Sequence, residues 1–201
     1  MCSALISESA RKTILAEATR RFASHGIAAT SLREVAKAAG VSPALVVHHY
    51  GSKEGLVAAA DEAAVGEFAQ AYADVDLAEG PELLRRRAEQ TAAVMRSRPD
   101  VCAYLGRALI EGTPGSSQLF RLMIEGGRSE IDRLAERGAL REDADRSWAT
   151  LQHFFLIWAP LSFRSLLERE VLDGSLLEEE NLERWVDANV ELLKGGLYRD
   201  E

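Results

Sequence analysis

Residues 40–56 read GVSPALVVHHYGSKEGL, and this stretch decides the fold. A tight turn at Gly40 leads to Ser42, a good N-cap, and to Pro43, whose missing N–H costs nothing at the first helical position. The apolar helix that starts there is short, because Gly51 interrupts it. The serine directly after that glycine can cap a further, longer helix. The stretch therefore predicts a short helix enclosed by two turns and followed by a long one.

Two helices are expected upstream of this stretch. Residues 7–25 carry apolar side chains with the helical period and end before Gly26, a residue type favoured at helix C-termini. The next helix begins at Ser31, where Ser-Leu-Arg-Glu forms a capping box in which Ser31 and Glu34 bond reciprocally. Two short helices joined by a sharp turn are a helix-turn-helix, whose second helix fits a DNA major groove about 12 Å wide. Many helical proteins that do not bind DNA contain such turns as well.

The remainder of the chain also reads with a helical period, and no segment alternates with the period of a strand. Gly126 and Gly127 should weaken one of these helices, and Pro160 should kink another. The further helices are expected over residues 53–75, 82–97, 99–111, 117–137, 144–171 and 178–195. The sequence thus predicts an all-α protein of about nine helices, with a three-helix helix-turn-helix domain over residues 1–52 and a larger helical domain over residues 53–201.

The charge of the chain is distributed unevenly. Residues 1–60 contain seven Lys or Arg and four Glu, a balance of +3, which leaves −11 for the remainder of a chain with a net charge of −8. An acidic surface repels polyanions, so the mildly basic head is the part expected to meet nucleic acid. Chance alone could also produce an imbalance of this size.

The cysteines and the apolar runs indicate a compartment. Cys2 and Cys102 provide neither a disulfide framework nor the CxxC spacing of zinc ligands, which favours a reducing cytoplasm. No signal peptide is visible at the N-terminus. The longest apolar run, residues 154–161, is shorter than the roughly 20 residues that a spanning helix needs. We therefore expect a cytoplasmic protein with no membrane partner.

The sequence contains none of the motifs that would predict an enzyme. GxxxxGK[ST], GxGxxG, GxSxG, HExxH and Cys/His clusters are all absent, and the carboxylates lie at helix starts and on charged faces. The adjacent His48 and His49 diverge by about 100° on a helix, whereas two ligands of one metal ion need an i, i+3 or i, i+4 spacing. We expect no catalytic activity, no metal and no cofactor.

A family resemblance adds to this interpretation. The block TSLREVAKAAGVSPALVVHHYGSKEGLV, residues 30–57, and the preceding ILAEATRRFASHGIAATS, residues 14–31, resemble the N-terminal domain of TetR-type transcriptional regulators. The G-V-S turn, the pair His49 and Tyr50, and the Ser-Lys-Glu helix start carry the resemblance. It implies a homodimer that binds an operator through its head. The family typically represses transcription and releases its operator when a small molecule binds the C-terminal effector-binding and dimerisation domain.

The exposed positions of the short helix and the matching family positions predict the DNA contacts. Arg33 suits bidentate bonding to guanine, and apolar side chains can meet thymine methyls. The expected base-reading residues are Arg33, Pro43, Ala44, Leu45, Val47 and His48. The expected phosphate contacts are Ser31, His49 and Lys53, the last beside a helix N-terminus. The chain departs from the family at Ala44 and Val47, where Gly and Tyr are common, so a phosphate contact of the tyrosine is lost.

Large apolar side chains on the last two helices suit the four-helix dimer interface that the resemblance implies. The residues expected there are Trp148, Leu151, Phe155, Trp158, Leu182, Trp185, Val186, Val190 and Leu193. The same faces could instead cover the core of a single chain. A dimer would place its two reading helices about 34 to 36 Å apart, which predicts a palindromic operator.

The effector pocket is expected among the helices of the body. Its candidate wall residues are Phe68, Tyr72, Met95, Tyr104, Leu105, Phe120, Met123, His153 and Phe154. Each is equally suited to the core, and a core histidine at position 153 would need a hydrogen-bond partner. The composition of this set favours a lipophilic, aromatic or acyl compound. The alternative function is a helical dimer that reads no DNA and binds a protein or sequesters a metabolite.

Overall fold

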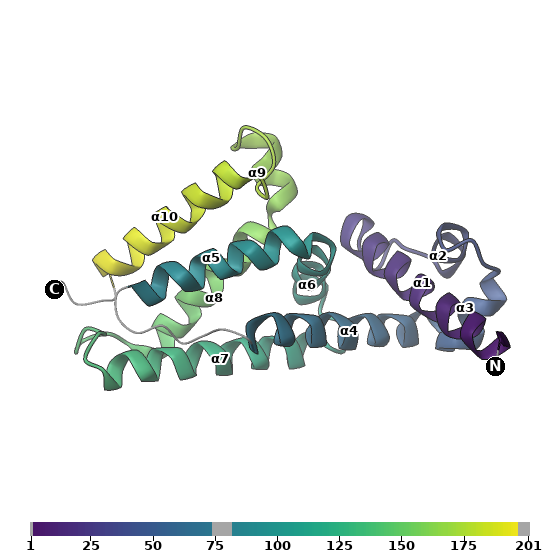
Figure 1. Cartoon of the computed structure of the whole chain (residues 1–201), viewed down its shortest axis with the longest axis horizontal. Coiled ribbons are helices and arrows are strands. Elements are labelled where there is room, and N and C mark those ends of the chain that lie inside the picture. The colour runs from purple at the N-terminus through teal and green to yellow at the C-terminus, as the bar shows by residue number, and fades with distance from the viewer. Residues whose placement is uncertain (1, 74–81, 197–201) are drawn as a thin grey trace. The chain divides into compact units, whose positions relative to one another are not determined.

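The computed structural model describes residues 2–73 and 82–196, which form helices and no strand (Figure 1). The helices are α1 (Cys2–His25), α2 (Leu32–Ala38), α3 (Pro43–Tyr50), α4 (Lys53–Ala73), α5 (Glu82–Ser97), α6 (Pro99–Glu111), α7 (Ser116–Glu136), α8 (Arg146–Ser162), α9 (Arg164–Glu170) and α10 (Glu179–Gly196). The predicted all-α fold is confirmed. The last two residues of the predicted helix over 53–75 lie outside the described residues.

The chain divides into two compact units. The head unit comprises residues 1–73 and 100–119, and the body unit comprises residues 74–99 and 120–201. The head unit therefore contains α4 and most of α6 in addition to the helix-turn-helix. The functional division at residues 52 and 53 stays a prediction.

The core of the head unit joins α1 to α4. Ile14 and Phe22 from α1, Val35 from α2, Val46 from α3 and Leu56 from α4 are all fully or almost fully buried. The α1 pair lies on one stripe of the helix, as the helical period predicts. This shared core holds the two short helices, α2 and α3, against the longer helices α1 and α4.

A buried carboxylate connects α4 to α6 inside the head unit. Asp61 accepts hydrogen bonds from the Tyr104 hydroxyl at 2.7 Å, the Thr113 hydroxyl at 3.0 Å and the Gly115 N–H at 2.9 Å. Burial raises the pKa of Tyr104, so its hydroxyl remains a donor. The Tyr104 ring also lies 6.2 Å from that of Phe22. A single acidic side chain thus fixes α6 and the loop after it to α4.

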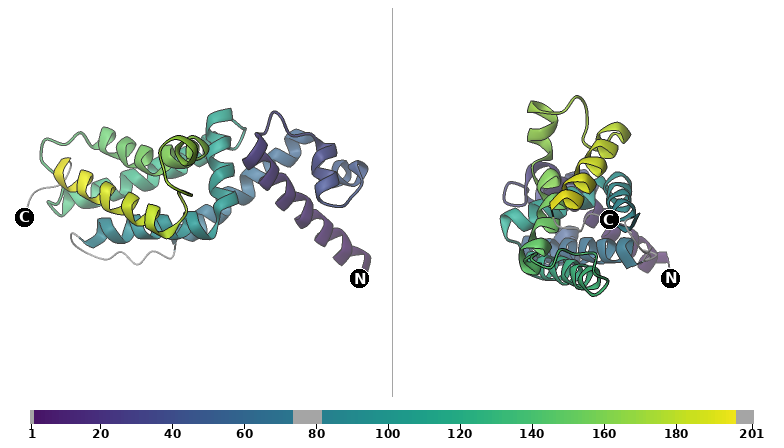
Figure 2. Two further views of the ribbon diagram at one scale, coloured as in Figure 1. Left: turned by 90° about the horizontal axis from the view of Figure 1, so that it is seen from above. Right: turned by 90° about the vertical axis from the view of Figure 1, so that its left-hand side faces the viewer.

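The body unit is built around α7, α8 and α10, with α5 alongside α10 (Figures 1 and 2). Ile131, Leu134, Leu140, Ala149 and Leu193 form one buried cluster in this unit. Leu193 belongs to α10, so the last helix contributes to the core of its own chain.

The predicted helix over residues 144–171 is divided in the structure. Pro160 lies inside α8, which continues to Ser162, and Phe163 separates it from α9. The guanidinium of Arg164 donates to Glu168 at 2.7 Å, and the same carboxylate accepts from the Ser175 hydroxyl at 2.6 Å. Contacts to the loop at Ser175 therefore fix α9. The kink expected at Pro160 does not by itself predict these contacts.

The two adjacent glycines of α7 predict opposite responses to alanine. A Cβ at Gly126 would meet nothing within 4 Å, whereas one at Gly127 would lie 3.3 Å from Cγ2 of Thr150 on α8. We expect Gly126→Ala to raise the free energy of unfolding by about 1 kcal/mol, because alanine restricts the unfolded chain more than glycine does. Gly127→Ala should gain clearly less, because Thr150 must move. Urea unfolding measures both, and equal gains would contradict the close approach of α7 and α8.

Candidate nucleic-acid interface

The backbone of the helix-turn-helix follows the capping chemistry of its sequence. The Ser31 hydroxyl accepts from the Glu34 N–H at 3.3 Å, and the Glu34 carboxylate accepts from the Ser31 N–H at 2.7 Å. These bonds to Ser31 lower the pKa of Glu34. The Ser42 hydroxyl accepts from the Leu45 N–H at 3.2 Å, and Gly40 between the helices has a φ of +66°. The predicted capping box and N-cap are confirmed.

The helix α3 has one buried and one exposed side. Val46 is fully buried, and Val41 before the helix and Tyr50 at its end are half-buried. The exposed residues of the predicted base-reading set on this helix are Pro43, Ala44, Val47 and His48, while Leu45 is half-buried. Val47 is 46% exposed, which is a high fraction for an apolar side chain. The predicted readers on α3 therefore share a surface that is available to a partner.

Arg33 is exposed near the start of α2. Lys37, one turn further along the same helix, is exposed as well. These two cations supply positive charge on the helix that precedes α3, as a surface for a polyanion requires.

The structure gives two of the three predicted phosphate residues, Lys53 and Ser31, an additional role. Lys53 donates its Nζ to the backbone carbonyl of Ala28 at 2.9 Å, which leaves two of its three N–H donors for a phosphate. His49 has a buried Nε2 atom that makes no hydrogen bond within the described residues. A phosphate contact through this nitrogen requires the ring to turn. Ser31, the third residue, is exposed and donates its hydroxyl to Glu34 at 2.7 Å.

Tyr50 fastens the end of α3 to α1. Its hydroxyl donates to the backbone carbonyl of Arg11 at 2.7 Å, and the Arg11 guanidinium lies 5.7 Å from the ring centre. Burial raises the pKa of this tyrosine. The aromatic residue after the histidine pair thus connects the end of α3 to α1.

The comparisons with known proteins match this geometry. Residues 14–60 match the family described as bacterial regulatory proteins, tetR family. The helix-turn-helix part of the chain, residues 14–60, is therefore similar to the TetR family. It is 34% identical over 129 residues to the HTH-type transcriptional regulatory protein RaaS of Mycobacterium tuberculosis, an alignment that covers 64% of this chain and 58% of that protein. The chain thus spans little more than half the length of this curated relative.

Solved structures share the fold along nearly the whole chain. The fatty acid degradation regulator FadR from Bacillus halodurans superposes with a TM-score of 0.74 at 18% identity, over 94% of this chain and 97% of that one. A putative transcriptional regulator from Saccharomonospora viridis in complex with choline gives a TM-score of 0.73 at 18% identity, over 96% and 100%. At such identities the likeness concerns the fold alone.

The predicted dimer-interface residues fall into two groups. Trp158, Leu182, Val186, Val190 and Leu193 are buried within their own chain, as the alternative of a monomer core foresaw. Leu151 and Trp185 are half-buried, and Trp148 and Phe155 on α8 are 59% and 53% exposed. Of the predicted set, only Trp148 and Phe155 therefore offer large apolar surfaces to a second copy.

The predicted effector residues are distributed over both units. Met95, Tyr104 and Leu105 are fully buried, Phe120 is exposed, and Phe68, Met123, His153 and Phe154 are half-buried. The side chain of Tyr72 lies outside the described residues. The Phe120 and Phe154 rings meet edge to face at 5.1 Å in the body unit. Nδ1 of His153 lies 2.8 Å from the Ala149 carbonyl, and burial lowers the pKa of this histidine, which favours a neutral ring.

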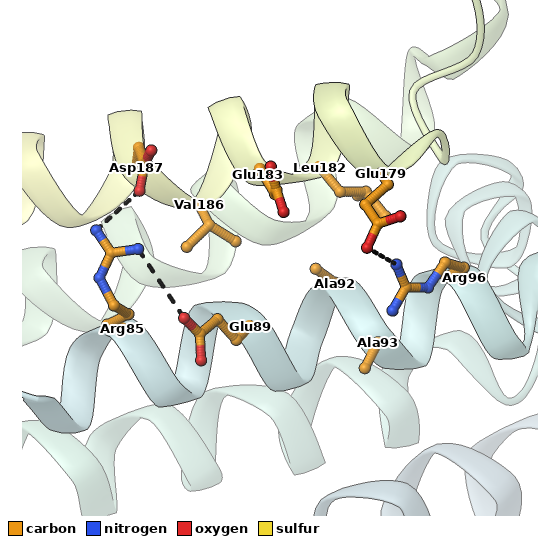
Figure 3. A pocket seen from close by; sticks show the side chains of 10 residues that line it. All are labelled: Arg85, Glu89, Ala92, Ala93, Arg96, Glu179, Leu182, Glu183, Val186 and Asp187. Carbon is orange, nitrogen blue, oxygen red and sulfur yellow. Dashed lines mark ion pairs between the residues drawn. The ribbon is translucent and has the colours of Figure 1, made fainter.

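A surface groove of about 310 Å³ lies between α5 and α10 in the body unit (Figure 3). Arg85 pairs with Asp187 at 2.8 Å near one end, and Arg96 pairs with Glu179 at 3.8 Å near the other. None of the predicted effector residues lines it. The ion pairs across this groove identify it as a seam between two packed helices of the same chain.

Residues 2–73 and 82–196 contain no candidate for a metal site or for a membrane span. No group of three or more His, Cys, Asp or Glu there could hold a metal ion. None of the helices in the same ranges is long and apolar enough to cross a membrane.

Proposed function

We propose that this chain is a sequence-specific DNA-binding regulator of transcription of the TetR type. The observation that carries the proposal is the exposed surface of α3, with Val47 and His48, which follows a helix that exposes Arg33. The major groove suits a helix of this kind, because its buried residues belong to the core and its exposed residues are small, apolar or able to form hydrogen bonds. Because its target is the genome, we place its action in the cytoplasm.

Each class of contact in the proposed complex has a chemical reason. Arg33 would bond the O6 and N7 atoms of a guanine, and Ala44 and Val47 would meet thymine methyl groups. His48 would bond a base edge or a phosphate. Lys53 would meet the phosphate backbone beside the N-terminus of α4, where free N–H groups favour an anion.

The proposed regulator acts as a homodimer on a palindromic operator. Trp148 and Phe155 of α8, together with Leu192 of α10, which is 61% exposed, support this assembly. Burying such side chains against a second copy would stabilise the dimer by about 25 cal/mol for each Å² of apolar surface. Two heads related by a two-fold axis would then reach successive major grooves of a symmetric site.

We further propose that a small molecule bound in the body unit controls operator affinity. Such an effector acts only by binding more tightly to a dimer shape in which the two heads do not fit the operator. The half-buried aromatic pair of Phe154 with exposed Phe120 favours an apolar or aromatic compound. In this scheme the effector-free dimer represses transcription, and the bound form releases the DNA.

Fluorescence anisotropy tests the proposed function. A labelled duplex of the DNA immediately upstream of the coding sequence is titrated at several salt concentrations, with a scrambled duplex as the control. We expect a preference of about a thousandfold for the native duplex and an affinity that falls as salt rises. Weak, equal binding to both, repeated with duplexes selected from a random pool, would sink the proposal. Such a result would favour the alternative of a helical dimer that binds a protein or a metabolite.

A further inference from the structure

One side chain of α6 reaches the turn between α1 and α2 in the head unit. The carboxylate of Glu111 accepts hydrogen bonds from the N–H of Ile27, which lies 3.1 Å from both of its oxygens, and from the N–H of Ala28 at 3.0 Å. These residues are more than 80 positions apart in the sequence. Glu111 is the last residue of α6, so the carboxylate connects the end of that helix to the segment that leads into α2.

The backbone of the turn is shaped to receive this carboxylate. Gly26 has a φ of +91°, and a Cβ added to it would lie 3.0 Å from an oxygen of Glu111. Consecutive backbone N–H groups after a left-handed residue form a concave site that binds anions. The turn therefore presents an anion site that an acidic side chain of the same chain already fills.

A hydrogen bond from α4 also holds this turn. The Ala28 carbonyl accepts the hydrogen bond from Lys53, the first residue of α4, while the Ala28 N–H donates to Glu111. The N–H of Ala28 is thus bonded to α6 and its carbonyl to α4. The end of α6 is in turn held to α4, because Asp61 binds Thr113 and Gly115 in the loop that follows Glu111.

We propose that Glu111 is a positioning residue that couples the end of α6 to the DNA-reading helices through the α1–α2 turn. The proposal rests on the proposed function and deepens it, because it names the connection by which a change in α6 would reach Ser31, Arg33 and the helix α3. Glu111 is exposed and water screens its charge, so the contact acts by fixing the position of the turn more than by stabilising the fold.

Coupling between two sites is reciprocal, and this makes the proposal testable without an effector. If α6 influences operator binding, operator binding must also influence α6. Hydrogen–deuterium exchange of the full-length dimer, with and without the operator duplex, is followed in three segments: residues 23–31 at the turn, 42–51 at the reading helix and 100–115 in α6. Circular dichroism first establishes that each variant is folded.

The wild-type dimer should exchange more slowly in all three segments when the operator is bound. In Glu111→Ala the turn should exchange on the order of tenfold faster without DNA, since its N–H groups lose their acceptor. Operator binding should still protect residues 42–51 of this variant and no longer protect residues 100–115. Glu111→Gln, which keeps the size and one oxygen, should give an intermediate result.

Asp100→Asn is the matched control. Asp100 lies at the start of α6 and pairs with Arg20 of α1 at 3.6 Å, with both side chains more than half exposed. The Asp100→Asn variant removes the same charge from the same helix as Glu111→Ala does. We expect it to behave as the wild type, because exposed ion pairs contribute little. Operator protection of residues 42–51 without any change in 100–115 of the wild type would overturn the coupling. Retained protection of 100–115 in Glu111→Ala would overturn it equally.

Failure of the proposed function gives a different result. If no duplex, including those selected from a random pool, protects residues 42–51 of the wild type, the protein does not read DNA through α3. The coupling proposal then falls together with the function on which it rests.

Discussion

Replacing Asp61 with alanine should lower the free energy of unfolding by about 3 kcal/mol, because it leaves several buried donors without an acceptor. Asp61 is 4% exposed and accepts from the hydroxyls of Tyr104 and Thr113 and from the N–H of Gly115. An unsatisfied buried donor costs roughly 1 to 3 kcal/mol. The three costs do not add fully, because the Tyr104 hydroxyl still has the Val57 carbonyl at 3.3 Å and because water can enter the space. The measurement is urea unfolding at a fixed protomer concentration, since dimerisation contributes to apparent stability.

Tyr104→Phe is the control for this prediction. It removes one donor and keeps the ring against Phe22, so we expect a loss of about 1 kcal/mol, the typical net value of one hydrogen bond. Asp61 would then retain two of its three donors. A loss for Asp61→Ala no larger than that for Tyr104→Phe would mean that the carboxylate does not hold the loop after α6.

Replacing Arg33 with alanine should relax the sequence specificity of DNA binding by about 1 to 3 kcal/mol at one base pair. The reason is that a bidentate bond from a guanidinium to guanine has no equivalent on another base. Affinity for the operator should fall, while affinity for a scrambled duplex should change much less. Anisotropy titrations of both duplexes at one salt concentration measure the two effects.

Lys37→Ala is the matched control, because Lys37 is an exposed cation on the same helix. As a phosphate contact it should weaken binding to both duplexes alike and reduce the salt slope by about one. Lys53→Ala should also weaken all sequences, with an additional effect of the lost bond to Ala28 on the position of the turn. An Arg33→Ala variant that behaves as Lys37→Ala does would make Arg33 a phosphate contact instead of a base reader.

Local sequence determined the helix-turn-helix. The capping bonds of Ser31 and Ser42 join residues three positions apart, and Gly40 and Gly51 allow the positive φ values at the two turns. The buried position of Val46 and the exposed positions of Val47 and His48 follow from the helical period. All of these features depend on neighbours in the chain, which is why residue order alone predicts them.

Long-range packing decided the features of the fold outside the helix-turn-helix. The sequence did not predict the division of α8 from α9, which depends on the bonds of Arg164 and Glu168 to Ser175. It left open whether the α10 stripe is buried in its own chain or against a second copy, and the structure buries it in its own chain.

The bonds of Asp61 to Gly115 and of Glu111 to Ile27 join residues 54 and 84 positions apart. No local pattern distinguishes these two acids from the other carboxylates of an acidic chain. The sequence by itself therefore determined the helices and the face that α3 exposes, because these depend on hydrogen bonds within a few residues. Only the tertiary structure decided which charged side chains hold the head in place, because their partners become neighbours only when the helices pack.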